Sequence, residues 1–213
     1  MVTFKHFSQV LRRWKKVRQS WINQRYVVVD IETTGLNPKT DEILSIAWVV
    51  VVPPMIDIGR RNQFTLKPVS SEKLGQSPII HGLTQRDFAH YSSIDTVLEK
   101  LKVELRGSCF VCHNAQVDWQ FLLHASKNTL QKLEPISVFD TLRYEHAVQN
   151  KNGPVREETG MYTLSSCRAR YGLPSYPAHD AMDDAIACAE LFLAQCLQTN
   201  EYSLSLRKLL KSY

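Results

Sequence analysis

The chain lacks any segment that is both long and apolar enough to span a membrane. Its longest apolar stretch covers residues 46–58 and is interrupted by Pro53, Pro54 and Asp57, whereas a membrane-spanning helix needs about 20 apolar residues. Internal repeats, low-complexity tracts and Gly/Ser-rich linkers are also absent from the sequence. These absences exclude a transmembrane segment and a repeat protein, and they favour a single compact domain with extensions.

Cysteine is scarce, and its pattern does not fit a disulfide framework. The 213 residues include five cysteines, an odd number, without a secretory hydrophobic region. We therefore expect reduced thiols and a cytoplasmic location. Cys109 and Cys112 form a CxxC pair inside an apolar run, and no second CxxC exists, so we expect neither a zinc site nor a redox role there. The composition, 44% hydrophobic and 22% charged, is that of an ordinary globular protein.

Acidic residues are missing from the first 25 positions. Those positions hold seven of the 26 lysines and arginines and none of the 21 acidic residues, which leaves 19 basic and 21 acidic residues in the remaining chain. Apolar residues recur there at helical spacing and predict a basic amphipathic helix over residues 1–24. Such a helix is compatible with several roles: docking on the body, binding of nucleic acid or a partner, binding of a membrane surface, and organellar targeting. The apolar positions are Phe7, Val10, Leu11, Trp14, Val17 and Trp21.

From Tyr26 onward, segments of strand character alternate with segments of helix character. Runs of β-branched residues, turn residues and proline breaks predict the strands, and apolar residues at helical spacing predict the helices. This alternation predicts an α/β layer architecture. The predicted strands are 26–32, 43–52, 59–67, 108–112 and 136–139, and the predicted helices are 93–105, 116–126, one from 140, 163–171, 180–197 and 203–211.

Two carboxylates at the end of the first predicted strand suggest a metal site. Asp30 and Glu32 are two positions apart, so the period of a strand places them on the same face. The neighbours Val27, Val29 and Ile31 indicate burial on both faces, where unpaired carboxylates are costly. A hard divalent cation such as Mg²⁺, which prefers carboxylate oxygens, would compensate these charges.

Two further clusters strengthen this interpretation. The first is HNAQVD at residues 113–118, which follows a predicted strand and begins a helix, so Asn114 lies where a helix cap would lie and Asp118 in the first turn. The second is HDAMDDA at residues 179–185, in which His179 precedes the Ala-rich helix and Asp184 lies one turn inside it. His179 and Asp184 can therefore face the same site.

Together these motifs resemble the DEDDh family of 3′–5′ exonucleases, which includes the proofreading subunit of bacterial replicative polymerase, ribonuclease T and oligoribonuclease. The resemblance covers about residues 26–195 and keeps the family's order of motifs. It implies a ribonuclease H-like exonuclease fold, with a central mixed β-sheet flanked by helices. The domain boundaries would be a basic arm over 1–25, an exonuclease domain over 26–200 and a short C-terminal helix or tail over 201–213. The matching segments are VVDIETTGL (28–36), HGLT (81–84), HNAQVD (113–118), FDT (139–141) and HDAMDDA (179–185).

The resemblance also assigns roles. It makes Asp30, Glu32, Asp118 and Asp184 the four acidic residues that hold two divalent cations, Mg²⁺ or Mn²⁺, and it makes His179 the general base. Two such metals can provide the attacking hydroxide and stabilise both the transition state and the leaving oxygen, and the ordinary pKa of histidine suits proton removal near neutral pH.

Two acidic neighbours qualify this assignment. The family's spacing of five from histidine to acid selects Asp184, while the adjacent Asp183 is the main ambiguity. We expect Asp180 and Asp183 to be bystanders.

Substrate contacts follow from the same resemblance. The segment Thr33, Thr34, Gly35 and Leu36 would lie against the terminal nucleotide, where a glycine permits a close approach to the backbone. His81 would lie near that nucleotide as well, and Asn114 would orient the site. We expect Asp140 to be a structural helix cap.

These observations predict a metal-dependent 3′–5′ exonuclease that hydrolyses phosphodiester bonds at single-stranded DNA 3′ ends in proofreading or repair. An RNA-trimming or oligoribonucleotide-degrading enzyme is the first alternative, since 2′-hydroxyl contacts cannot be read from the sequence, and a nonenzymatic nucleic-acid-binding or partner-binding module is the second. DNA is favoured over RNA, and a DNA polymerase, a repair partner or a homodimer is compatible with the resemblance. The short stretch after residue 200 does not resemble the polymerase-binding tail of the proofreading subunit, so we expect a stand-alone or differently partnered nuclease.

Overall fold

The structure is a computed structural model that describes most of the chain. His179, His81 and the HGLT motif fall outside the described residues, as do Phe7, Val10 and Leu11 of the predicted N-terminal helix. The described residues are 13–66, 91–129, 131–154, 156, 158–176, 180–199 and 201–210.

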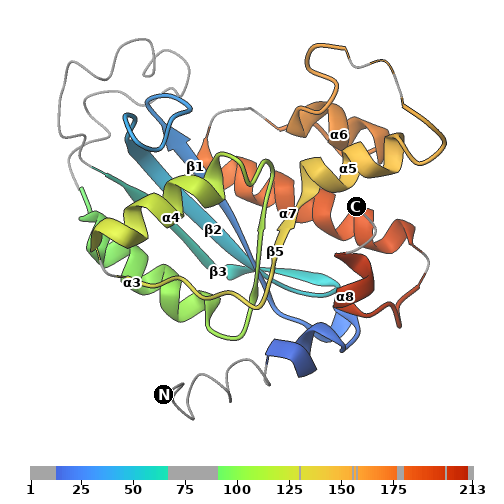
Figure 1. Cartoon of the computed structure of the whole chain (residues 1–213), viewed down its shortest axis with the longest axis horizontal. Coiled ribbons are helices and arrows are strands. Elements are labelled where there is room, and N and C mark those ends of the chain that lie inside the picture. The colour runs from blue at the N-terminus through green and yellow to red at the C-terminus, as the bar shows by residue number, and fades with distance from the viewer. Residues whose placement is uncertain are drawn as a thin grey trace.

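A five-stranded mixed sheet forms the centre of the molecule (Figure 1). Its strand order is β3-β2-β1-β4-β5, in which β1 pairs antiparallel with β2 and parallel with β4. The strands β2 and β3 are antiparallel, whereas β4 and β5 are parallel. The predicted α/β fold with a central mixed sheet is therefore confirmed. The strands are β1 Tyr26–Thr33, β2 Ile43–Val52, β3 Met55–Thr65, β4 Cys109–Cys112 and β5 Val138–Asp140.

Helices cover both faces of this sheet. On one face, Val27, Val29 and Ile31 of β1 pack in a core cluster with buried side chains of α3 and α4. On the other face, Tyr26 and Val28 pack in a second cluster that includes buried side chains of α7. Burial of β1 on both faces, predicted from its apolar residues, is thus observed. The helices are α3 Ile94–Leu105, α4 Asp118–Thr129, α5 Thr141–Gln149, α6 Leu164–Arg170, α7 Ala181–Gln198 and α8 Leu206–Leu209, with a 3-10 turn at Trp21–Asn23.

Side-chain caps fix the starts of several helices. Ser93 accepts a hydrogen bond from the backbone N–H of Thr96 at the start of α3, and Thr163 accepts one from Ser166 at the start of α6. Asp140 caps α5, as predicted, by accepting from the N–H groups of Leu142 and Arg143. Such caps satisfy N–H groups that have no partner inside the helix, so these boundaries agree with the sequence to within a few residues.

Two predicted elements differ in extent. The third strand was predicted from residue 59 but begins at Met55, because Val52 pairs with Met55 directly across Pro53 and Pro54. Most of β3 is exposed, as is usual for a strand at the edge of a sheet. Because its residues are largely polar, no apolar pattern marked where the strand begins. The last helix was predicted over 203–211, whereas α8 spans only Leu206–Leu209 and starts at the Ser205 cap.

The described part of the N-terminal segment docks on the body. Trp21 is buried in the core, and its backbone N–H donates to the carbonyl of Leu204 at 2.9 Å. Arg13 donates to the carbonyl of Ile136 at 2.7 Å, and Lys16 donates to that of Gly107 at 2.6 Å. Of the alternatives for this segment, docking is therefore realised for residues 13–24.

Among the described residues, no helix combines the length and the apolar character that crossing a membrane requires.

Candidate active site

Three carboxylates meet at the carboxyl end of β1. The side chains of Asp30 and Glu32 come from β1 itself, and that of Asp184 comes from the first turn of α7. Their carboxylate oxygens lie within 4.8 Å of one another. The predicted pairing of Asp30 and Glu32 on one face of the strand is thus observed, and the third member is Asp184 rather than Asp183.

Small residues allow α7 to approach the sheet at this point. In β2, Ala47 lies beside Asp30 in the strand register, and it packs against Ala181 and Ala185 of α7. These alanines are one turn apart on the same helix face. Because alanines from the helix and the strand form this contact, Asp184, which precedes Ala185, comes within reach of β1. The Ala-rich start of α7 therefore has a direct role in building the site.

Asp118 joins the site from a third element. It is the first residue of α4 and is only 5% exposed. The parallel pairing of β1 with β4 ends at Val28, and beyond that point the carboxylate of Asp118 accepts a hydrogen bond from the backbone N–H of Ile31. It thus lies beside β1, although it is not part of the mutually close group formed by Asp30, Glu32 and Asp184.

The electrostatics of the site show an excess of negative charge. Burial raises the pKa of Asp30 well above its usual range, and the charges of Asp118 and Asp184 raise it further. Burial and the nearby charge of Asp184 raise the pKa of Glu32 to about 7. Burial also raises the pKa of Asp118, although the N–H donors of Asp118 itself and of Ile31 oppose that shift. Like charges in a poorly hydrated site favour protonation of the carboxylates unless a cation compensates them.

Asp180 contributes to the site in a way the sequence analysis missed. Its carboxylate caps α7 by accepting from the N–H groups of Met182 and Asp183, and it also accepts from the side-chain amide of Gln63 on β3 at 3.2 Å. Its charge adds to the field that raises the pKa of Glu32. The preference for aspartate immediately before a helix could have identified the cap, whereas nothing local indicates the contact with β3.

Asp140 links two loops that border the site. Besides capping α5, it accepts hydrogen bonds from the backbone N–H groups of Asn114 at 3.1 Å and of Ala115 at 2.9 Å. Asn114 has a positive φ of 96°, and its carbonyl accepts from Asp118 at 3.3 Å. Asn114 and Asp140 therefore hold the turn that presents Asp118.

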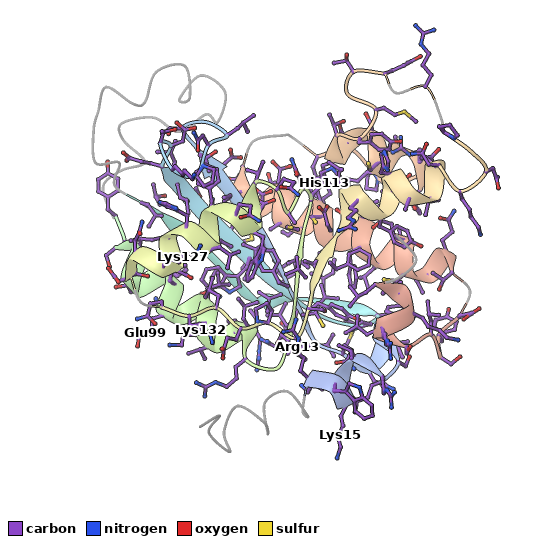
Figure 2. The ribbon with its side chains drawn as sticks, in the orientation of Figure 1. Arg13, Lys15, Glu99, His113, Lys127 and Lys132 are labelled. Atoms are coloured by element: carbon purple, nitrogen blue, oxygen red, sulfur yellow. The ribbon has the colours of Figure 1, made fainter. Side chains whose placement is uncertain are left out.

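His113, which is partly buried, also supports this region. Its Nδ1 lies 2.8 Å from the hydroxyl of Thr141, and its Nε2 lies 2.9 Å from the carbonyl of Tyr162. Burial lowers its pKa. Figure 2 shows His113 close to the helices α5 and α6. These contacts indicate a role in fixing the loop after β4.

The segment after β1 forms an ordered turn. The hydroxyl of Thr34 accepts from the N–H of Glu42 at 2.9 Å, and the hydroxyl of Thr33 donates to the carbonyl of Gly35 at 2.6 Å. A Cβ atom at Gly35 would lie 2.5 Å from the carboxylate of Asp41. The contact with Asp41 therefore favours glycine at this position, independently of any substrate. Leu36 is 77% exposed and projects from this turn as an apolar surface.

The CxxC cysteines are free, buried side chains of β4. The other three cysteines are also free and buried. Burial raises the pKa of both Cys109 and Cys112, which disfavours the reactive thiolate. These thiols belong to the core.

Comparison with known proteins decides the family. A sequence model of the RNase T exonuclease family matches residues 27–192. The chain belongs to this family of exonucleases. The resemblance to DEDDh exonucleases is therefore confirmed, and residues 27–192 form an exonuclease domain. The acidic cluster of Asp30, Glu32 and Asp184 is consistent with the metal dependence of this family.

The relatives are longer proteins than this chain. The chain is 32% identical over 174 residues to the PolC-type DNA polymerase III of Thermotoga petrophila, which covers 82% of the chain and 12% of that protein. Identity with the PolC-type DNA polymerase III of Staphylococcus aureus is 28% over 177 residues, covering 83% of the chain and 12% of that protein. The chain thus spans about one eighth of the length of these curated relatives.

Solved structures share the fold at low sequence identity. Cell-death related nuclease 4 matches with a TM-score of 0.66 and 21% identity, covering 82% of this chain and 64% of that chain. Exonuclease I of E. coli, solved in complex with an oligonucleotide, matches with a TM-score of 0.64 and 17% identity, covering 84% of this chain and 41% of that chain. These matches confirm the ribonuclease H-like exonuclease fold.

Proposed function

We propose that the chain is a metal-dependent 3′–5′ exonuclease that hydrolyses phosphodiester bonds at single-stranded DNA 3′ ends. The observation that carries this proposal is the convergence of Asp30, Glu32 and Asp184, whose carboxylate oxygens lie within 4.8 Å of one another on an exonuclease fold. A folded site with this much uncompensated negative charge is suited to binding cations and poorly suited to binding nucleic acid directly.

The donor set fits divalent metal ions. Carboxylate oxygens are the ligands that Mg²⁺ and Mn²⁺ prefer. The raised pKa values of Asp30 and Glu32 are the expected property of ligands without their ion, because the ion must displace protons when it binds. Asp30, Glu32 and Asp184 would hold the ions directly, and Asp118, which lies beside β1, would complete the site.

The protein's contribution is positioning and proton transfer. When bound, two divalent ions supply neutralisation of phosphoryl charge and generation of a nucleophile at neutral pH. The carboxylates on β1, α4 and α7 fix where these ions lie, since each strand or helix holds its side chain rigidly. His179, which precedes the Asp180 cap of α7 in the sequence, would act as the general base.

The turn after β1 would receive the terminal nucleotide. The exposed Leu36 offers an apolar surface for a base or sugar, and the internal hydrogen bonds of Thr33 and Thr34 hold the turn that carries it. His81 would contact the same nucleotide from the segment outside the described residues. Asn114 would act by orienting Asp118 through the α4 turn.

DNA is the favoured substrate. The relatives include PolC-type DNA polymerases, and the fold matches an exonuclease I that was solved with single-stranded DNA. We infer a proofreading or repair setting, with a DNA polymerase, a repair protein or a second copy of the chain as partner, and the similarity to these relatives supports it. Trimming of RNA is the alternative, and the ratio of DNA to RNA cleavage decides between them.

The test uses 5′-labelled single-stranded DNA and RNA oligomers with Mg²⁺, Mn²⁺ or EDTA. We expect a ladder that shortens from the 3′ end, requires the metal and favours DNA. The variant Asp184→Asn should cut the rate by on the order of 100-fold or more, because it removes a proposed ligand, while the matched control Asp183→Asn should stay within about three-fold of wild type. Cleavage that resists EDTA, or equal loss in both variants, would overturn the proposal.

A further inference from the structure

A hollow lies where the N-terminal segment meets the C-terminal end of the chain. Its volume is about 310 Å³, and its lining combines aromatic, aliphatic and arginine side chains from residues 13–18 and from the end of α8. This volume is at the lower limit of ordinary ligand pockets. The lining residues are Trp14, Val17, Arg18, Arg207 and Leu210.

The lining of this hollow combines apolar and charged side chains. Val17 and Leu210 pack against the main core cluster. The guanidinium of Arg18 lies over the ring of Trp14, 3.5 Å from its centroid, and Trp14 is still 50% exposed. Arg18 and Arg207 are exposed, and within the described residues neither makes an ion pair. The hollow thus presents an aromatic surface beside two arginine side chains that are available to anions.

The surroundings are basic as well. Residues 13–25 contain no acidic residue. Lys15, which is exposed, projects away from the body beside the hollow, as Figure 2 shows. An exposed aromatic ring next to arginines in a positive surface is the combination that binds single-stranded nucleic acid, since bases stack on the ring and phosphates contact the cations.

The hollow lies far from the carboxylates. Figure 1 shows α8 and the N-terminal segment beside the C-terminal half of α7, whereas Asp184 lies in its first turn. The 18 residues of α7 span about 27 Å at 1.5 Å per residue. This length sets the scale of the separation, which amounts to several nucleotides at about 3.4 Å per nucleotide of a stacked strand.

We propose that this hollow is a second contact for the single strand, which holds nucleotides upstream of the 3′ end that lies at the carboxylates. The inference rests on the proposed function for the identity of the strand. One base stacks on the open face of Trp14, and the phosphates beside it contact Arg18 and Arg207. The contact increases the affinity for long strands and has no part in the chemistry.

The first test measures binding of the full chain to fluorescent 5-mer and 20-mer DNA. It uses an Asp30→Asn background, so that the strand is not cut, and varies the salt concentration. The double variant Arg18→Ala/Arg207→Ala should weaken binding of the 20-mer and reduce the slope of log K against log salt by about 1.4, because each phosphate contact on a single strand contributes about 0.7. The control Lys127→Ala/Lys151→Ala removes two exposed charges elsewhere and should leave the slope unchanged.

Strand length and stacking provide the other discriminating measurements. The variant Trp14→Leu should weaken binding of the 20-mer by about five-fold, the lower end of base–aromatic stacking, and all variants should bind the 5-mer within about two-fold of their background. The inference would be overturned if the variants weakened binding of the 5-mer and the 20-mer equally. It would also be overturned if the Arg18→Ala/Arg207→Ala variant had the same salt slope as the control. Variants that bind DNA normally but lose binding to phosphatidylserine vesicles would assign the hollow to a membrane surface and also overturn it.

The inference and the proposed function fail in different ways. If the wild-type chain cleaves no oligomer with Mg²⁺ yet the hollow variants weaken binding of the 20-mer, the strand contact stands and the nuclease proposal fails. If the wild-type chain cleaves in a metal-dependent manner while the hollow variants bind as the control does, the nuclease proposal stands and the second contact is refuted.

Discussion

Replacing Glu32 by glutamine should stabilise the metal-free protein at alkaline pH. Glu32 is only 7% exposed, and burial together with the charge of Asp184 raises its pKa from 4.5 to about 7. The folded state therefore favours the protonated carboxyl more than the unfolded state does. Below about pH 4.5 both states are protonated and Glu32 imposes no penalty, whereas above about pH 7 the charged form destabilises the fold.

The magnitude follows from the shift in pKa. A change from 4.5 to about 7 corresponds to about 3.4 kcal/mol at 1.36 kcal/mol per unit. Because protonation is linked to folding, about 2.5 kcal/mol of this free energy of unfolding should be lost as the pH rises from 5 to 8. For a chain of this length, 1 kcal/mol changes Tm by about 2–4 °C, so the metal-free Glu32→Gln variant should melt about 7–14 °C above wild type at pH 8 and near wild type at pH 4.

The assay is thermal and urea unfolding in EDTA from pH 4 to pH 8, repeated with saturating Mg²⁺. Glu99→Gln is the matched control, since Glu99 is an exposed residue of α3, and it should leave the pH dependence unchanged. Mg²⁺ should stabilise wild type more than Glu32→Gln at pH 8, because binding removes the penalty that the variant already lacks. A wild-type stability that does not fall between pH 5 and pH 8, or a variant no more stable than wild type at pH 8, would refute the reasoning.

Substitutions at two further positions test the turns that present the carboxylates. Asp140→Ala should lower the free energy of unfolding by about 3 kcal/mol, because four backbone N–H groups lose their acceptor, and Asp140→Asn should recover more than half of that loss in urea unfolding. Asn114 has a φ of 96°, so Asn114→Gly should change the free energy of unfolding by no more than about 0.5 kcal/mol. Asn114→Val should lower it by about 1–2 kcal/mol, because a β-branched residue is strained at this φ. Equal stabilities of Asn114→Gly and Asn114→Val would contradict this account.

The central strand and its two carboxylates could be predicted from the sequence. The run of β-branched residues around Val28 specifies a strand by local preference and hydrophobicity, and the period of a strand alone places Asp30 and Glu32 on one side. The cap at Asp140 could be predicted for a similar reason, since a cap depends on residues only two or three positions away.

Other features depended on contacts between distant segments. The choice of Asp184 over Asp183 depends on Ala181 and Ala185 packing against Ala47, because this packing sets the rotation of α7 relative to β1. The bond from Gln63 to Asp180 spans 117 positions. The bond from Gln63 to Asp180 has no local pattern that a sequence could display. The spacing from His179 had already selected Asp184 through the family resemblance, and the packing of α7 supplies the physical reason.

Sequence alone determined the family of folds, the strand that holds the first two carboxylates and the candidate acidic residues, because these depend on local periodicity and on motifs a few residues long. Only the tertiary structure decided which carboxylates lie within reach of one another and how Trp21 fixes the basic segment on the body. The physical reason is that convergence of charges and close packing depend on distances in space, which the folded core sets once separate segments lie against one another.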